Sequence, residues 1–149
     1  MSLPTAQHVK HHHDWSDAAD QVTLDYDARF LRRKVLTAAS GERFLVDLDQ
    51  TVSLSQGDAL ALSDGRLVEV IAAKEALLEI TAADLVRIAW HVGNRHTPCQ
   101  IEDSRLLIQR NHVMQDMLEK LGATLREVEE PFTPEGGAYG HGRTHGHAH

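Results

Sequence analysis

The spacing of hydrophobic residues changes near Leu77, and this change constrains the fold more than any other feature of the chain. Before it, short segments such as Val22–Tyr26 and Phe44–Leu48 alternate apolar and polar residues, as half-buried strands do. Glycine-containing segments between the strands predict hairpin turns at 40–42 and 63–66. The sequence therefore predicts a small all-β domain over residues 1–75.

Residues 76–136 predict a second domain with the element order β-α-β-β-α-β. A Thr81–Asp84 capping box with Thr81 as N-cap is expected to start the first helix, and Gly93–Asn94 to end it. Asn111 is suited to cap a second helix that ends at Gly122. The apolar stripes of the two helices are Leu85, Ile88, Ala89 and Val92, then Met114, Met117, Leu118 and Leu121. Strands are expected at 78–80, 97–102, 105–109 and 125–128. This order is that of the ferredoxin-like fold, so the predicted fold class is α+β.

The last segment, residues 137–149, is rich in glycine and histidine and cannot pack a core, which predicts a disordered tail. Imidazole is the commonest side-chain metal ligand, so the tail histidines are candidate ligands: His141, His145, His147 and His149. Such a tail is expected to collect ions and release them, not to hold one ion for catalysis. A purification tag or a merely solvated polar tail are the alternatives.

Among the histidines expected in ordered structure, His112 is the strongest candidate ligand. It falls in the first turn of the second helix, where the helix dipole disfavours a protonated, cationic imidazole. Gln115, Asp116 and Glu119 share its helical face, so a carboxylate is placed to orient it. One imidazole cannot hold a metal, but a two-fold homodimer supplies a second copy. A capping or surface role is the alternative.

The remaining candidates have simpler interpretations. His91 belongs with Asp84 and Arg87 to a polar helix face, and His96 suits local structural hydrogen bonding. Cys99 is interpreted as a small apolar strand residue. His8 and His11–His13 are further possible metal ligands in a stretch expected to be disordered.

Composition excludes several partners and compartments. The formal charge of -7 and the 5% aromatic content argue against nucleic acid, including an RNA-binding ferredoxin-like domain. A single cysteine excludes an internal disulfide framework and a CxxC metal site. No signal peptide and no apolar run long enough to span a membrane is visible, so no membrane partner and a cytoplasmic location are expected.

Catalytic motifs are absent as well. The chain has no HExxH, GxSxG, P-loop or GxGxxG sequence. Catalytic zinc generally needs three ordered protein ligands, whereas these histidines are split between one helix and two tails. The sequence therefore predicts that the protein is not an enzyme, with a metallohydrolase as a remote alternative.

Three segments carry a resemblance to a known family. Ala89–His96 resembles the hLGNRH motif of the UreE urease accessory proteins, and Asn111–Leu118 is similar to their DHVLDDML segment. Pro131–Tyr139 resembles their PFxPExGAY segment, and a histidine-containing tail follows. The resemblance is strong over roughly the last 70 residues and loose over the β-rich first half.

The resemblance implies a homodimeric nickel chaperone that delivers Ni(II) to apo-urease together with the accessory GTPase UreG and other urease accessory proteins. It implies a peptide-binding N-terminal domain and a metal-binding, dimerising C-terminal domain. His112 then matches the interface ligand supplied by both subunits, and the tail histidines match auxiliary ligands. The tail is short for the histidine-rich branch of the family, and Asn111 stands where Asp is common.

The ligands alone do not select nickel. Imidazole suits Ni(II), Cu(II) and Zn(II), and Cu(II) lies above Ni(II) in the Irving–Williams order. Zn(II) or Cu(II) is therefore expected to bind the same ligands. A general Zn/Cu/Ni-buffering protein without a dedicated delivery target is the alternative function.

Overall fold

A computed structural model describes residues 2–136 of the chain, which divides into two compact units between Ala73 and Lys74. The predicted tail histidines therefore lie outside the described residues. No helix among the described residues is long and apolar enough to cross a membrane.

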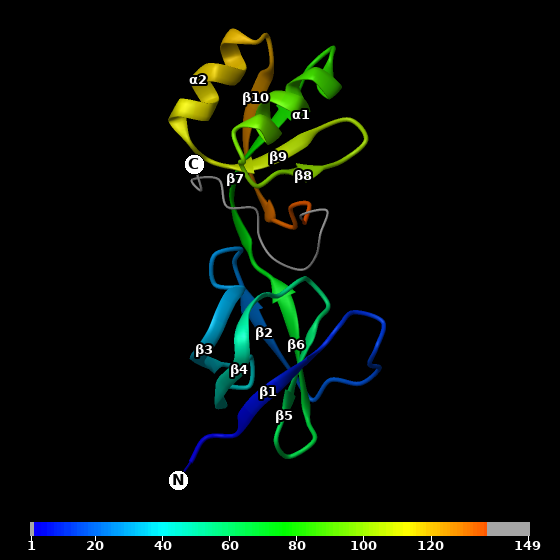
Figure 1. Ribbon diagram of the computed structural model, residues 1–149, viewed down its shortest axis with the longest axis vertical. Coiled ribbons are helices and arrows are strands. Elements are labelled where there is room, and N and C mark those ends of the chain that lie inside the picture. Colours follow the sequence, from blue (N-terminus) through cyan, green and yellow to red (C-terminus); the bar gives the residue numbers. More distant parts are fainter. Residues whose placement is uncertain (1, 137–149) are drawn as a thin grey trace. The chain divides into compact units, whose positions relative to one another are not determined.

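The first unit is a six-stranded sheet with the strand order β2-β6-β5-β1-β4-β3 (Figure 1). Its strands are β1 (Thr5–Lys10), β2 (Asp20–Leu24), β3 (Phe30–Thr37), β4 (Arg43–Ser53), β5 (Ala59–Leu62) and β6 (Leu67–Ala72). The β1–β4 and β2–β6 pairs are parallel, and the other neighbours are antiparallel. The predicted all-β character is confirmed.

The core of this sheet follows from alternation along its strands. In β6 every second residue is buried, and Val68 and Val70 pack with Val22 and Leu24 of the neighbouring β2. Gly41 and Gly65 both have φ +92° in the β3–β4 and β5–β6 connections. The two predicted hairpin turns are therefore confirmed, because a positive φ costs glycine little.

The N-terminal stretch is ordered, so the expectation of disorder around its histidines was wrong. β1 pairs with β4 on one side and β5 on the other, and Ala6 is fully buried. The loop that follows is fastened to the Ser55–Asp58 turn: the buried Asp58 carboxylate accepts from the His12 backbone N–H at 3.2 Å, and the Trp15 indole donates to the Gly57 carbonyl at 2.9 Å. These contacts join residues 12 and 15 to residues 57 and 58, and the polar sequence around His12 contains no pattern that predicts them.

The second unit has the predicted β-α-β-β-α-β order. Its elements are β7 (Lys74–Thr81), α1 (Leu85–Asn94), β8 (Gln100–Ile101), β9 (Leu106–Gln109), α2 (His112–Lys120) and β10 (Thr124–Pro131). The sheet order β10-β7-β9-β8 and its fully antiparallel pairing are those of a ferredoxin-like domain. The predicted α+β fold class is thereby confirmed.

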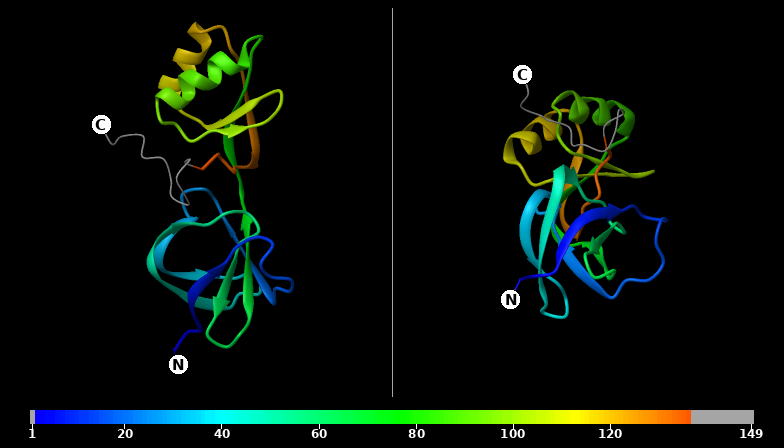
Figure 2. Two further views of the ribbon diagram at one scale, coloured as in Figure 1. Left: turned by 45° about the vertical axis from the view of Figure 1, so that its right-hand side comes forward. Right: turned by 60° about the horizontal axis from the view of Figure 1, so that its bottom comes forward.

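Both helices cover the same face of this sheet (Figure 2). Ile88 and Val92 of α1 and Met114 and Leu118 of α2 are buried against inward-facing strand residues such as Ile80. The predicted stripes are confirmed, because their other members also pack partly buried on this cluster.

The start of α1 differs from the prediction. Thr81 is the last residue of β7, paired with Thr124 of β10, and the N-cap is Asp84, whose carboxylate accepts from the Arg87 N–H at 3.2 Å. Sheet pairing occupies Thr81, and an aspartate is as good a cap as a threonine. Asp84 is thus a cap and not only a member of a solvated face.

Candidate metal site

His112 is the first residue of α2, and the local sequence fixes it there. The Asn111 side-chain oxygen accepts from the backbone N–H groups of Val113 at 2.9 Å and Met114 at 3.1 Å, as predicted for the cap. Met114 and Leu118 anchor the helix in the core, while His112 itself is exposed. The imidazole is therefore presented to solvent from a fixed backbone position.

A hollow of about 500 Å³ lies between the end of α1 and the start of α2. Its lining residues are Asn94, Arg95, His96, Thr97, Asn111, Val113 and Met114. The Thr97 hydroxyl bridges its two sides, because it lies 3.6 Å from the Met114 sulfur. The hollow thus joins two segments that are separate in sequence and that flank His112.

His96 makes the local hydrogen bond expected of it, and it also has a place in the hollow that sequence analysis did not predict. It is half-buried, it lines the hollow, and its φ of +56° places it in the left-handed region. α1 ends at Asn94, which confirms the predicted end at Gly93–Asn94, and the left-handed residue follows two positions later: the His96 N–H donates to the Gly93 carbonyl at 2.9 Å. A non-glycine residue held there costs on the order of 1–3 kcal/mol, and such residues cluster at functional sites.

A signal for His96 was present in the sequence. It closes the Gly93–His96 motif, Asn111 opens the Asn111–Leu118 segment, and three residues of each line the same hollow. Their spacing along the chain did not reveal this, because only the packing of α1 beside α2 brings them together.

The described residues do not complete a metal site alone. Within 2–136, no group of three or more histidine, cysteine, aspartate or glutamate side chains is arranged to hold an ion. His91 lies instead with its ring 5.0 Å from the Trp90 ring, edge to face. His141, His145, His147 and His149 are beyond the described residues, so their role stays a prediction.

Cys99 is unsuited to bind metal as a thiolate near neutral pH. Burial, with a smaller effect from the Glu135 carboxylate, raises the pKa of this thiol to about 11. The neutral form is therefore dominant, as the interpretation of Cys99 as a small apolar residue requires.

The segment before the tail is fastened beside β8. The Glu135 N–H donates to the Cys99 carbonyl at 2.9 Å, and the Thr133 N–H donates to the Gln100 side-chain oxygen at 2.9 Å. Phe132 is fully buried. Residue 136 therefore lies close in space to Cys99, which is only three residues after His96 in the sequence.

The fold and the hollow define a class of protein: a β-sheet domain followed by a ferredoxin-like domain that carries imidazoles at one end of its helical layer. The sequence of residues 3–73 matches the family model of the UreE urease accessory protein N-terminal domain. Residues 75–149 match the family model of the UreE C-terminal domain. The chain belongs to the UreE urease accessory protein family.

Individual relatives agree with this family assignment. The chain is 66% identical over 149 residues to the urease accessory protein UreE of Ruegeria pomeroyi, with both chains covered completely. It is 65% identical over 147 residues to that of Ruegeria sp. strain TM1040, covering 97% of this chain and 84% of the relative. It is 61% identical over 135 residues to that of Rhodobacter capsulatus, covering 91% and 86%.

Proposed function

We propose that this protein is a non-enzymatic nickel chaperone, which binds Ni(II) through histidines at a homodimer interface and delivers it for urease metallocentre assembly. Nickel is the cargo and not a resident cofactor. The observation that carries the proposal is the hollow between α1 and α2, where His96 lies beside the helix start that presents His112. Family membership supplies the link to urease.

Ligand counting supports a dimeric site. The described part of one protomer offers no group of three ligands, and a two-fold interface repeats every ligand it contains. Two copies of His96 and His112 would provide four imidazoles. The helical layer also exposes Val86, Trp90 and Val113, with 83%, 63% and 52% of their surface accessible, and a second protomer would cover such side chains.

The tail supplies the remaining ligands in this proposal. His141 is six residues beyond Glu135, so the connection between them can span up to about 20 Å when it is extended. That is ample to reach a site near His96, because Glu135 is bonded to Cys99. His145, His147 and His149 reach further still and suit capture and release of ions.

Delivery requires partners, which we propose to be the accessory GTPase UreG, other urease accessory proteins and apo-urease, in the cytoplasm. Selection of nickel over Zn(II) or Cu(II) comes from these partners and from metal supply, since imidazole ligands alone favour copper. The charge of -7 suits a protein that handles cations and not nucleic acid.

Titration calorimetry with Ni(II) on the full chain tests the site. We expect His96→Ala and His112→Ala each to weaken binding, and truncation after Gly140 to lower the number of ions bound per dimer. His8→Ala is the matched control, because His8 is an exposed histidine on β1 in the other unit. If neither site variant differs from His8→Ala, the site assignment is wrong.

A cellular assay separates delivery from buffering. In cells that lack this protein, wild type should restore urease activity at limiting nickel, whereas His96→Ala and His112→Ala should not. Restoration by an unrelated nickel-binding protein would favour the alternative, a general Zn/Cu/Ni-buffering protein. Sedimentation measurements on the same samples report whether the dimer persists in each variant.

A further inference from the structure

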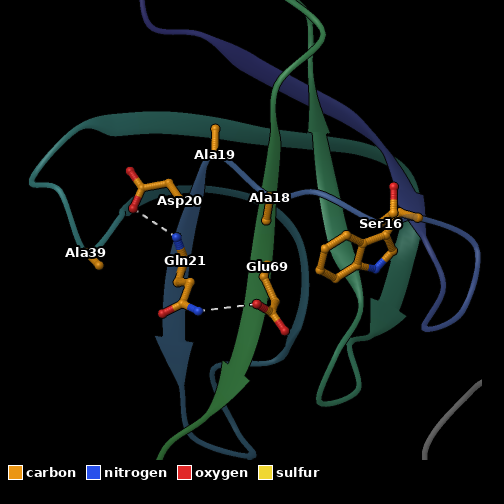
Figure 3. Close-up of a pocket in the computed structure, with 8 residues that line it drawn as sticks. Ser16, Ala18, Ala19, Asp20, Gln21, Ala39 and Glu69 are labelled. Atoms are coloured by element: carbon orange, nitrogen blue, oxygen red, sulfur yellow. Dashed lines mark hydrogen bonds between the residues drawn. The ribbon is translucent and has the colours of Figure 1, made fainter.

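A second hollow, in the first unit, has no part in nickel binding as proposed above. It measures about 470 Å³ and lies at the start of β2 and the middle of β6 (Figure 3). Its lining residues are Trp15, Ser16, Ala18, Ala19, Asp20, Gln21, Ala39 and Glu69. Three alanines and an indole make up its apolar wall, and two carboxylates supply its charge.

The indole wall is held in place. The Trp15 N–H donates to the Gly57 carbonyl at 2.9 Å, and the ring is only partly exposed. The same loop is fastened by the His12 N–H on the buried Asp58 carboxylate. An aromatic surface fixed in this way is ready for a ligand and loses little conformational entropy on binding.

The two carboxylates are held at neighbouring places on the paired strands. Gln21 links them: its backbone N–H donates to Asp20 at 2.8 Å, and its side-chain amide donates to Glu69 at 3.3 Å (Figure 3). Hydrogen bonds from the Ser40 hydroxyl and the Gln21 N–H hold the pKa of Asp20 below its usual range. Asp20 is therefore anionic at neutral pH.

No cation of the described chain neutralises these charges by direct contact. Among residues 2–136 no ion pair within 4.0 Å joins Asp20 or Glu69 to a basic side chain. Arg66 acts on Asp20 from a distance, but its guanidinium is bound by Glu42 at 2.7 Å and Asp64 at 2.8 Å. The hollow therefore keeps a net negative potential, which its concave shape focuses.

An aromatic face beside carboxylates is the arrangement that recognises an organic cation. We propose that this hollow binds a basic side chain, an arginine or lysine presented by a protein partner, with the cation between the Trp15 ring and the Glu69 carboxylate. It is a docking point separate from the metal site, and it goes beyond the proposed nickel function without depending on it. A guanidinium gains most, because it stacks on an indole while its N–H groups pair with a carboxylate.

Nuclear magnetic resonance on the full chain tests this assignment. The probe is N-acetyl-arginine methylamide, with the neutral citrulline analogue at equal ionic strength as its control. We expect the arginine probe, at concentrations up to about 50 mM, to shift the Trp15 indole N–H and Glu69 amide resonances saturably, because single exposed cation sites are weak. The citrulline analogue should leave both resonances in place.

Two variants locate the effect. Glu69→Gln keeps the shape of the side chain and should weaken the arginine response by about two- to five-fold, as loss of one solvent-accessible charge partner does. Glu127→Gln, on exposed β10 of the other unit, is the matched control and should respond as wild type does. Equal shifts by citrulline, an unchanged Glu69→Gln response, or shifts by Mg(II) but not by arginine would each overturn the proposal.

Discussion

The Thr97 hydroxyl lies 3.6 Å from the sulfur of Met114, so the segment that leaves α1 is joined directly to the first turn of α2. Met114 is buried in the helical core, and Thr97 follows the left-handed His96. The position of His96 therefore depends on how α2 begins. This dependence makes the cap of α2 a sensitive point of the candidate site.

Replacing Asn111 should test that dependence. We expect Asn111→Ala to lower the free energy of unfolding by about 0.5–2 kcal/mol, because the N–H groups of Val113 and Met114 lose their acceptor. The same variant should weaken Ni(II) binding, since α2 would fray at His112. Urea unfolding and calorimetry measure the two effects, and Asn111→Asp, which keeps the cap, should show neither loss of stability nor fraying.

The stability of the fold in acid should depend on the ion pairs that Arg105 forms with Glu79, Glu102 and Glu130. Arg126 and Arg105 hold the pKa of Glu79 below its usual range, and Arg105 does the same for Glu130. The stabilisation that the ionised Glu79 and Glu130 give the fold is complete above about pH 4.3, the pKa of a glutamate in the unfolded chain. It is lost as the pH falls through the lower pKa values of the folded protein. The melting temperature of wild type should therefore fall more steeply below about pH 4.5 than that of Arg105→Gln.

Arg87→Gln serves as the charge-matched control for that measurement, because Arg87 is exposed on α1. The melting temperature of Arg87→Gln should change with pH as that of wild type does. The same pH dependence for Arg105→Gln would mean that the ion pairs of Arg105 do not couple folding to carboxyl ionisation.

Gly57 should be far less tolerant of a side chain than Gly65. Both have φ near +91°, so alanine is strained at either position by about 1 kcal/mol. A Cβ on Gly57 would also overlap the His12 ring, whereas nothing lies within 4 Å of one on Gly65. Gly57→Ala should thus unfold at a lower urea concentration than Gly65→Ala, and His12→Ala should narrow the difference. Equal midpoints would contradict the packing of His12 on this turn.

Cys99 should resist alkylation in the native protein. Its pKa of about 11 leaves little thiolate near neutral pH, and the residue is half-buried. Iodoacetamide labelling followed by mass spectrometry should be slow in buffer and fast in urea. Fast labelling of the folded chain would show that the segment around Glu135 opens readily.

Nickel affinity should fall on acidification, because protons compete with metal for imidazole nitrogen. A free imidazole protonates near pH ~6.5, so binding by histidines should weaken below about pH 6. Calorimetry at about pH 7.5 and about pH 5 measures the change. Equal affinity at both would exclude imidazole as the main ligand.

Local patterns predicted the second unit well because its helices satisfy purely local rules. The stripe around Ile88 and Val92 and the Asn111 cap are readable within a few residues. The mistakes arose where distant segments compete with local ones. Thr81 is a fair cap in isolation, but pairing with Thr124 keeps it in β7.

The site was only partly predictable for the same reason. The position of His112 in the first turn of a helix was predictable, because the Asn111 cap before it is a local signal; its role as a ligand stays a prediction. The place of His96 in the hollow, its left-handed backbone and the ordered loop of His12 all depend on contacts between segments far apart in the chain. No periodicity in a single sequence encodes such contacts.

The central place of β1 in its sheet has a kinetic consequence. Thr5 pairs with Leu45 and Ala6 with Leu62, so the strand synthesised first must wait for partners made much later. Until then the groups β2-β6-β5 and β4-β3 have no strand between them. Closure of such long loops slows folding, and we expect the first unit to fold only after translation has passed β6. On the ribosome, the exposed edges of β4 and β5 would then be the surfaces most in need of protection from misassociation.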